Sequence, residues 1–156
     1  MISQTIPGFG ALRLQHLVLD YNGTLALDGR LLPAVRPRLR ALARLVSVHV
    51  ITADTFGTVE RALRGLPCKV VVLAARHQDA AKARYVRALG ERRTACIGNG
   101  RNDRLMLRAA RLGIAVLGRE ASAAAALAAA DVVAPSIEVA LDLLLKPLRL
   151  TATLRA

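Results

Sequence analysis

Asp20 is the first residue of this sequence that could do chemistry, because it stands directly after an apolar run and directly before a turn signal. The run 17–19 predicts a strand buried on both faces, as in a parallel sheet, and Asn22-Gly23 is typical of a tight turn. A carboxylate at the carboxyl end of such a strand lies where open α/β sheets bind ligands, and it can serve as a nucleophile or a metal ligand. The stretch alone equally allows Asp20 to do no more than begin the turn.

Three further polar residues follow other predicted strands: Thr52 ends the second, Lys82 lies after the third and Asp103 follows the fourth. Because carboxyl ends of parallel strands share one edge of a sheet, we expect these groups to converge on Asp20. A hydroxyl holds phosphoryl oxygens, a lysine neutralises developing charge and a second carboxylate completes a metal site, so the set suits phosphoryl transfer. The alternatives are a strand-capping Thr52 and a surface Lys82, with Lys69 as a second lysine at the wrong edge.

Apolar spacing divides the chain into alternating strands and helices. We expect strands at about 14–20, 48–52, 69–73, 94–97, 114–116 and 131–133. Helices are expected from about 35, over 56–66, 78–90 and 102–111, in the Ala-rich stretch after 121, and over 136–145. This alternation predicts a single α/β domain over residues 1–156, with three α/β/α layers in a Rossmann-like order, a mainly parallel sheet of about six strands and right-handed crossovers.

The remaining segments are expected to be loops. Residues 1–13 contain a proline and two glycines that favour a loop. The loop 21–33 is expected to form a small flap whose hairpin turn is Asp28-Gly29. Asp54 or Thr55 is expected to cap the helix that follows the second strand.

Composition limits the class of protein. The chain is 54% hydrophobic, so it is expected to fold rather than stay disordered. Its formal net charge is +12, but the arginines are spread along the chain and aromatic residues make up only 3%, so nucleic acid is not expected as the main partner. No apolar run is long enough to cross a bilayer, and no secretory signal is expected. Two cysteines without a ligand cluster predict a cytoplasmic protein with reduced thiols, and no membrane partner is expected.

Four short motifs, in order, resemble those of the haloacid dehalogenase (HAD) superfamily. Residues 20–25, Asp-Tyr-Asn-Gly-Thr-Leu, are similar to the first motif, Asp-x-Asp-Gly-Thr-Leu. Ile51-Thr52 resembles the second motif, and Lys82 the third. Residues 98–103, Gly-Asn-Gly-Arg-Asn-Asp, resemble the fourth, usually Gly-Asp-Gly-x-Asn-Asp, in a form shared by P-type ATPases and the small phosphatases similar to them. The resemblance covers about residues 14–145 and implies a HAD fold without a cap domain.

The resemblance implies a Mg²⁺-dependent site that forms an aspartyl-phosphate on Asp20 from a phosphorylated substrate of unknown identity. The implied catalytic residues are Asp20, Asn22, Thr52 and Lys82; the implied phosphate-binding residues are Gly23, Thr52, Ala53, Lys82 and Asn102; and the implied metal ligands are Asp20, the backbone carbonyl of Asn22, Asn99 and Asp103. Capless members often act on bulky substrates or close their site with a neighbouring subunit, so a homo-oligomer is one expected state.

Two departures from the family pattern predict weak chemistry. The second Asp of the first motif, usually the general acid/base, is Asn22, and an amide cannot shuttle protons. Losing such a group lowers a rate by on the order of 10²–10⁴. The first Asp of the fourth motif is Asn99, whose neutral oxygen attracts Mg²⁺ less than a carboxylate does. We therefore expect a slow phosphatase or phosphotransferase with a weak Mg²⁺ site; the alternative is a phosphate-binding or regulatory protein that keeps the fold with little catalysis.

Overall fold

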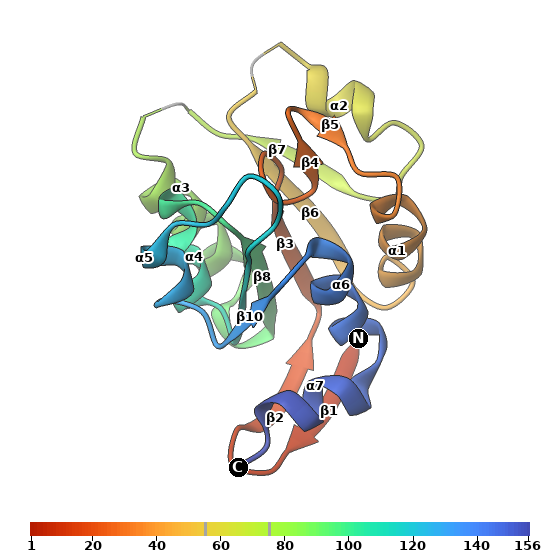
Figure 1. Cartoon of the computed structure of the whole chain (residues 1–156), viewed down its shortest axis with the longest axis vertical. Helices are drawn as coiled ribbons and strands as arrows, with labels where there is room; N and C mark the ends of the chain where they lie inside the picture. The colour runs from red at the N-terminus through yellow and green to blue at the C-terminus, as the bar shows by residue number, and fades with distance from the viewer. Residues whose placement is uncertain (55, 75) are drawn as a thin grey trace.

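A six-stranded parallel sheet forms the middle of the structure, a computed structural model that describes residues 1–54, 56–74 and 76–156 (Figure 1). The strand order is β10-β9-β8-β3-β6-β7, and all neighbours run parallel. The strands are β3 (His16–Asp20), β6 (Ser47–Thr52), β7 (Lys69–Val72), β8 (Thr94–Gly98), β9 (Leu112–Val116) and β10 (Val132–Ala134). The predicted α/β fold with about six parallel strands is confirmed, and β3, which ends at Asp20, lies between β6 and β8.

Side chains of β3 alternate between two hydrophobic cores because successive residues of a strand point to opposite faces. Leu17 and Leu19 pack in the core on the side of α1 (Val35–Leu42) and α6 (Ile137–Leu145). Val18 packs in the core on the side of α3 (Gln78–Leu89), α4 (Arg104–Ala109) and α5 (Ala124–Leu127). Burying each such side chain contributes about 1.5–3 kcal/mol. Helices thus cover both faces, as predicted, and hold β3 rigidly beneath the candidate site.

The predicted loop over residues 1–13 is wrong. Residues there form an antiparallel hairpin of β1 (Ile2–Ile6) and β2 (Gly10–Leu14), which projects below the sheet in Figure 1. The apolar residues Ile2, Ile6, Leu12 and Leu14 are buried, and an unpredicted helix, α7 (Pro147–Leu154), packs against β1. Pro7 and Gly8 lie in the turn of the hairpin and Gly10 begins β2, so the residues that favour a loop here form a tight turn between two strands.

The predicted hairpin turn at Asp28-Gly29 is confirmed, while several helix boundaries differ. The short strands β4 (Ala26–Leu27) and β5 (Arg30–Leu31) pair across Asp28 and Gly29, both with positive φ, as a two-residue hairpin turn requires. The helix predicted at 56–66 is the short α2 (Thr58–Ala62). A 3₁₀ turn, η1 (Glu91–Arg93), precedes β8, and a second, η2 (Arg101–Asp103), precedes α4.

The prediction of Asp54 as the N-cap of α2 is wrong, because the N-cap residue is Gly57, but the Asp54 side chain still accepts a hydrogen bond from the first turn of the helix. Its carboxylate accepts hydrogen bonds from the backbone N–H groups of Phe56 at 2.9 Å and Val59 at 2.8 Å, and these bonds lower its pKa. Thr55, the alternative cap, lies outside the described residues. No helix in the described ranges is both long and apolar enough to cross a membrane.

Candidate active site

Lys82 joins two buried carboxylates at the carboxyl edge of the sheet. Its Nζ donates to Asp20 Oδ1 at 2.6 Å and to Asp103 Oδ1 at 2.7 Å. Lys82 is 2% exposed, Asp103 0% and Asp20 8%. Lys82 comes from α3, Asp20 ends β3 and Asp103 ends η2, so three separate segments converge here as the strand-end pattern predicted. The surface interpretation of Lys82 is wrong, because the side chain is buried and doubly paired.

The loop after β8 holds Asp103 from the other side. Asp103 Oδ2 accepts from the backbone N–H groups of Asn99 at 3.0 Å and Gly100 at 2.8 Å. Gly98 is required beneath it, because a Cβ at that position would lie 2.6 Å from Asp103 Cγ. Every oxygen of this carboxylate therefore has a hydrogen-bond partner, which is what a buried charge needs.

Thr24 links Asp20 to Asn99 and was not among the predicted site residues. Its hydroxyl lies 3.5 Å from Asp20 Oδ2 and donates to Asn99 Oδ1 at 3.1 Å. The amide group of Asn99 in turn donates to the carbonyl of Ala121 at 3.1 Å. Gly23 must stay a glycine, since its φ is +72° and a Cβ there would lie 2.5 Å from Asn99 Nδ2. The signal in the sequence for Thr24 was its position in the first motif, where it places a hydroxyl group four residues after the carboxylate of Asp20.

Among the residues that the structure describes, the other predicted site residues form no hydrogen bond with Lys82. Thr52 is buried at the end of β6, the strand beside β3, and its hydroxyl accepts from the backbone N–H of Asp54 at 3.0 Å. Ala53 follows it, half-buried. Asn22 is exposed, in the loop that follows β3. Asn102 donates to Gln78 Oε1 at 2.8 Å and so faces the start of α3.

The pKa values of both Asp20 and Lys82 are raised within the cluster. Burial raises the pKa of Asp20 to about 7; Asp103 adds to the shift and Lys82 opposes it. Burial disfavours the Lys82 cation, but Asp20 and Asp103 outweigh that effect and the pKa of Lys82 is raised. Lys82 therefore stays a cation at neutral pH, whereas Asp20 is divided between its ionised and protonated forms.

The donor set fits a divalent hard cation, though with few anionic ligands. Asp20 and Asp103 both reach the position of one Nζ atom, and Mg²⁺ in proteins is commonly held by one or two carboxylates with waters and substrate phosphate completing its shell. The described residues contain no group of three or more His, Cys, Asp or Glu that could hold a metal. The oxygen donors present here are therefore two carboxylates and the amide oxygen of Asn99, and the weak Mg²⁺ site stays a prediction.

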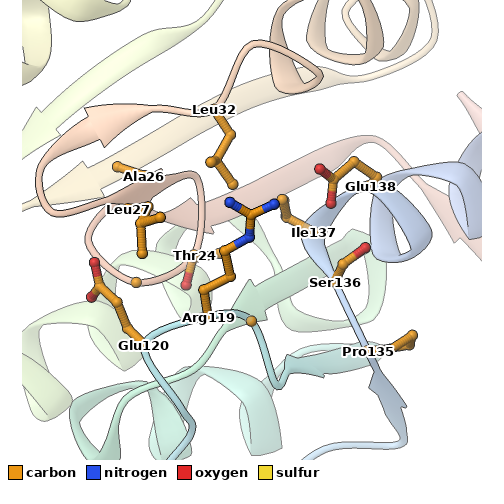
Figure 2. Close-up of a pocket in the computed structure, with 12 residues that line it drawn as sticks. Thr24, Ala26, Leu27, Leu32, Arg119, Glu120, Pro135, Ser136, Ile137 and Glu138 are labelled. Carbon is orange, nitrogen blue, oxygen red and sulfur yellow. The ribbon is translucent and has the colours of Figure 1, made fainter.

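A cavity of about 350 Å³ adjoins the loop that follows β3 (Figure 2). It shares Gly23 and Thr24 with that loop, and Figure 2 shows the Arg119 guanidinium crossing it toward Ile137 and Glu138. Neither Asp20 nor Lys82 lines it, and its charged lining residues are Arg119, Glu120 and Glu138. One positive and two negative side chains in this lining do not favour an anionic phosphate there.

Comparison with known proteins gives a fold match and two short sequence matches. No protein-family model matches the sequence. The structure resembles 3-deoxy-D-manno-octulosonate 8-phosphate phosphatase from Moraxella catarrhalis, solved with magnesium, phosphate and KDO, with a TM-score of 0.70 and 18% identity over 85% of this chain and 86% of that one. It also resembles a HAD subfamily III A hydrolase from Legionella pneumophila, with a TM-score of 0.71 and 18% identity over 90% and 86%. A zinc-transporting PIB-type ATPase matches with a TM-score of 0.63 and 22% identity over 78% of this chain and 20% of that one.

Two proteins of Methanocaldococcus jannaschii, both named as uncharacterized, match in sequence. MJ0073 is 49% identical over 59 residues, which are 38% of this chain and 63% of MJ0073, so the match spans less than two thirds of that protein. MJ0072 is 38% identical over 39 residues, 25% of this chain and 89% of MJ0072. The chain thus has the fold of these HAD hydrolases, and by sequence it belongs to the same family as MJ0072.

Proposed function

We propose that the chain is a Mg²⁺-dependent phosphatase or phosphotransferase that works slowly through an aspartyl-phosphate on Asp20. The observation that carries the proposal is the buried Asp20–Lys82–Asp103 cluster at the carboxyl edge of the sheet. A carboxylate is a known nucleophile toward phosphorus, and a fixed lysine beside it stabilises charge that develops on the transferring group. The likeness to HAD phosphatases supports the same class of reaction.

Each residue of the cluster has a defined task in this reaction. An ionised oxygen of Asp20 attacks phosphorus, a P–O bond forms to Asp20, and the bond to the leaving oxygen breaks with its electron pair. Thr52 and the backbone N–H groups of the loop after Asp20 hold phosphoryl oxygens, while Lys82 offsets their charge. Asp20, Asp103, the Asn22 carbonyl and Asn99 would hold Mg²⁺, which when bound screens negative charge on the phosphoryl group.

The reaction needs two proton transfers, and the side chain at position 22 is not suited to carry out either of them. The leaving oxygen needs a proton, and the water that hydrolyses the aspartyl-phosphate must lose one. Asn22 can orient a water or an oxygen by hydrogen bonding, but it has no proton to exchange near neutral pH. We therefore place the slow step at hydrolysis of the aspartyl-phosphate, so that this species accumulates.

Acetyl phosphate with Mg²⁺, followed by mass spectrometry, tests the proposal. We expect a single phosphoryl adduct on Asp20 that is stable in acid, is removed by hydroxylamine and is absent from Asp20→Asn. The intact mass of the starting protein must be checked, because deamidation of Asn22-Gly23 would supply the missing carboxylate. Absence of the adduct at saturating Mg²⁺ contradicts the proposal, and fast turnover of a phosphatase panel that is abolished in Asp20→Asn contradicts its slow step.

The second candidate is a phosphate-binding or regulatory protein with the same fold and little catalysis. Asn22 and Asn99 together favour it, because they remove a proton carrier and a metal-binding charge from one site. On this proposal, inorganic phosphate raises the melting temperature of the wild type and not of Lys82→Met, while acetyl phosphate leaves no adduct. The two candidates are thus separated by the adduct alone.

A further inference from the structure

We propose that the loop over residues 121–123 holds the side chain of Asn99 as a fixed, neutral amide, so that position 99 of this chain accepts asparagine and disfavours the aspartate usual in the HAD pattern. The loop lies between β9 and α5 in the chain, and Asn99 directly follows β8, the strand between β9 and β3. The proposal rests on the proposed function only where it concerns Mg²⁺, because the hydrogen bonds that carry it do not depend on any reaction.

Three hydrogen bonds join this loop to Asn99. The side-chain Nδ2 of Asn99 donates to the backbone carbonyl of Ala121 at 3.1 Å. The backbone carbonyl of Asn99 accepts from the hydroxyl of Ser122 at 2.9 Å and from the backbone N–H of Ala123 at 2.9 Å. Two of the bonds thus fix the backbone of Asn99, and the bond to Ala121 fixes how its amide group is turned.

The carbonyl of Ala121 determines which end of the amide faces the candidate active site. A carbonyl oxygen accepts hydrogen bonds and donates none, so it selects the NH2 end of the amide. The other end, Asn99 Oδ1, is turned toward Thr24, whose hydroxyl donates to it at 3.1 Å and lies 3.5 Å from Asp20 Oδ2. Asn99 therefore turns an oxygen, the kind of atom that Mg²⁺ binds, toward the Asp20 side of the loop.

The backbone of Ala121 is strained at the point where it contacts the amide. Its φ is +69°, in the left-handed region that is unfavourable for a residue with a Cβ. Such a conformation persists only where the surrounding structure requires it, and it is typical of functional sites. The amide is packed on another side against Gly23, where a Cβ would lie 2.5 Å from Asn99 Nδ2. The strained loop and the glycine together enclose a group of the size and polarity of an amide.

An aspartate at position 99 fits this arrangement poorly. It has no N–H group to donate to Ala121, so a carboxylate oxygen would face a carbonyl oxygen and the two acceptors would repel each other. It would also add a third carboxylate to Asp20 and Asp103, which share the ammonium group of Lys82. Both effects act before any metal binds, so the low negative charge of the site follows from how the loop is built.

Asn22→Asp supplies a matched control for Asn99→Asp, because it makes the same chemical change in an exposed side chain of the same site. Urea denaturation of the full chain in EDTA measures the equilibrium constant for unfolding of the wild type and both variants. We expect Asn99→Asp to raise this constant about tenfold or more, as the loss of a partner by a polar group does, and Asn22→Asp to change it less than about threefold.

Ala121→Gly tests whether the loop is the cause. Glycine adopts a positive φ without strain and leaves the carbonyl free to turn away from position 99. Alone it should change the unfolding constant less than about threefold, whereas added to Asn99→Asp it should reverse most of the loss, and the difference measures the coupling of the two positions. If Asn99→Asp alone does not fold, recovery of folding by Ala121→Gly gives the same answer, and no recovery overturns the proposal.

Calorimetric titration with Mg²⁺ gives a readout that a purely structural role would not move. A carboxylate that is free to approach a divalent cation should lower the dissociation constant about tenfold or more. We expect less than about threefold from Asn99→Asp alone, and the larger change only when Ala121→Gly is added. Where no form binds Mg²⁺, the unfolding constants decide.

Three results overturn the proposal: an Asn99→Asp variant as stable in EDTA as Asn22→Asp, an equal effect of Ala121→Gly with and without Asn99→Asp, or a gain in Mg²⁺ affinity of about tenfold from Asn99→Asp alone. None of these measurements requires turnover. Absence of the adduct on Asp20 would therefore contradict the proposed function and leave this inference standing.

Discussion

Replacing Lys82 with methionine perturbs the whole cluster at once. Methionine fills most of the space of the buried side chain, one atom shorter than lysine, but leaves Asp20 and Asp103 facing each other without a cation. Removing one partner of a buried ion pair typically costs about 3–5 kcal/mol. Because the pKa of Asp20 is already about 7, this group takes up a proton at pH 7 for under about 1 kcal/mol, which removes one of the two charges. We therefore expect a loss of about 3 kcal/mol in the free energy of unfolding at pH 7, near the lower end of that range.

The loss should grow with pH. Asp20 has a folded-state pKa above its unfolded value, so its ionised form opposes folding, and without Lys82 that penalty is larger. Between pH 6 and pH 9 the difference between wild type and Lys82→Met is expected to widen as Asp20 in the variant is forced to ionise. Adding Asp20→Asn to Lys82→Met removes the titrating group and should recover part of the stability and flatten the pH dependence.

Urea denaturation in EDTA measures these free energies, and Lys146→Met is the control. Lys146 also touches a carboxylate, Asp142 at 3.2 Å, but it is exposed, so its loss is expected to cost under about 1 kcal/mol. A Lys82→Met variant that loses no more stability than Lys146→Met would refute the reasoning from burial. A loss that does not change with pH would refute the assignment of the titration to Asp20.

Three further outcomes are expected. Asn22→Asp restores a proton carrier and should speed hydrolysis of the aspartyl-phosphate by on the order of 10²–10⁴, measured as decay of the adduct after acetyl phosphate is removed; an unchanged decay contradicts the proposed slow step. Burial lowers the pKa of His49 from 6.5 to about 4, so the unfolded chain takes up a proton at a higher pH than the folded chain does. The free energy of unfolding should therefore fall by about 3 kcal/mol as the pH drops from 6.5 to 4. In urea denaturation, His49→Gln should lessen this fall, while His77→Gln, on the surface, should not. Gly98→Ala places a Cβ 2.6 Å from Asp103 Cγ and should cost about 1–3 kcal/mol together with loss of the adduct, and a variant of wild-type stability contradicts the close approach.

The parts of the fold that could be predicted from the sequence are those whose structure depends on residues close to one another along the chain. Leu17–Leu19 read as a doubly buried strand because both faces of β3 are covered, and Asp28-Gly29 read as a hairpin turn because its backbone needs positive φ. The hairpin of β1 and β2 was missed, since its period-2 apolar pattern is short and only packing against α7 makes it stable. Thr24 was missed as a site residue for a similar reason: only the fold brings its hydroxyl within reach of Asn99.

The sequence by itself determined the kinds of group available at the strand ends, namely Asp20, Thr52, Asp103 and the two asparagines that replace carboxylates. It also determined the alternation of strands and helices, because apolar periodicity and turn residues act over a few neighbours. Only the tertiary structure decided that Lys82, 62 residues from Asp20 and 21 from Asp103, places one ammonium group against both carboxylates. That contact depends on how α3 and β8 pack around β3, and the burial produced by this packing is what raises the pKa of Asp20.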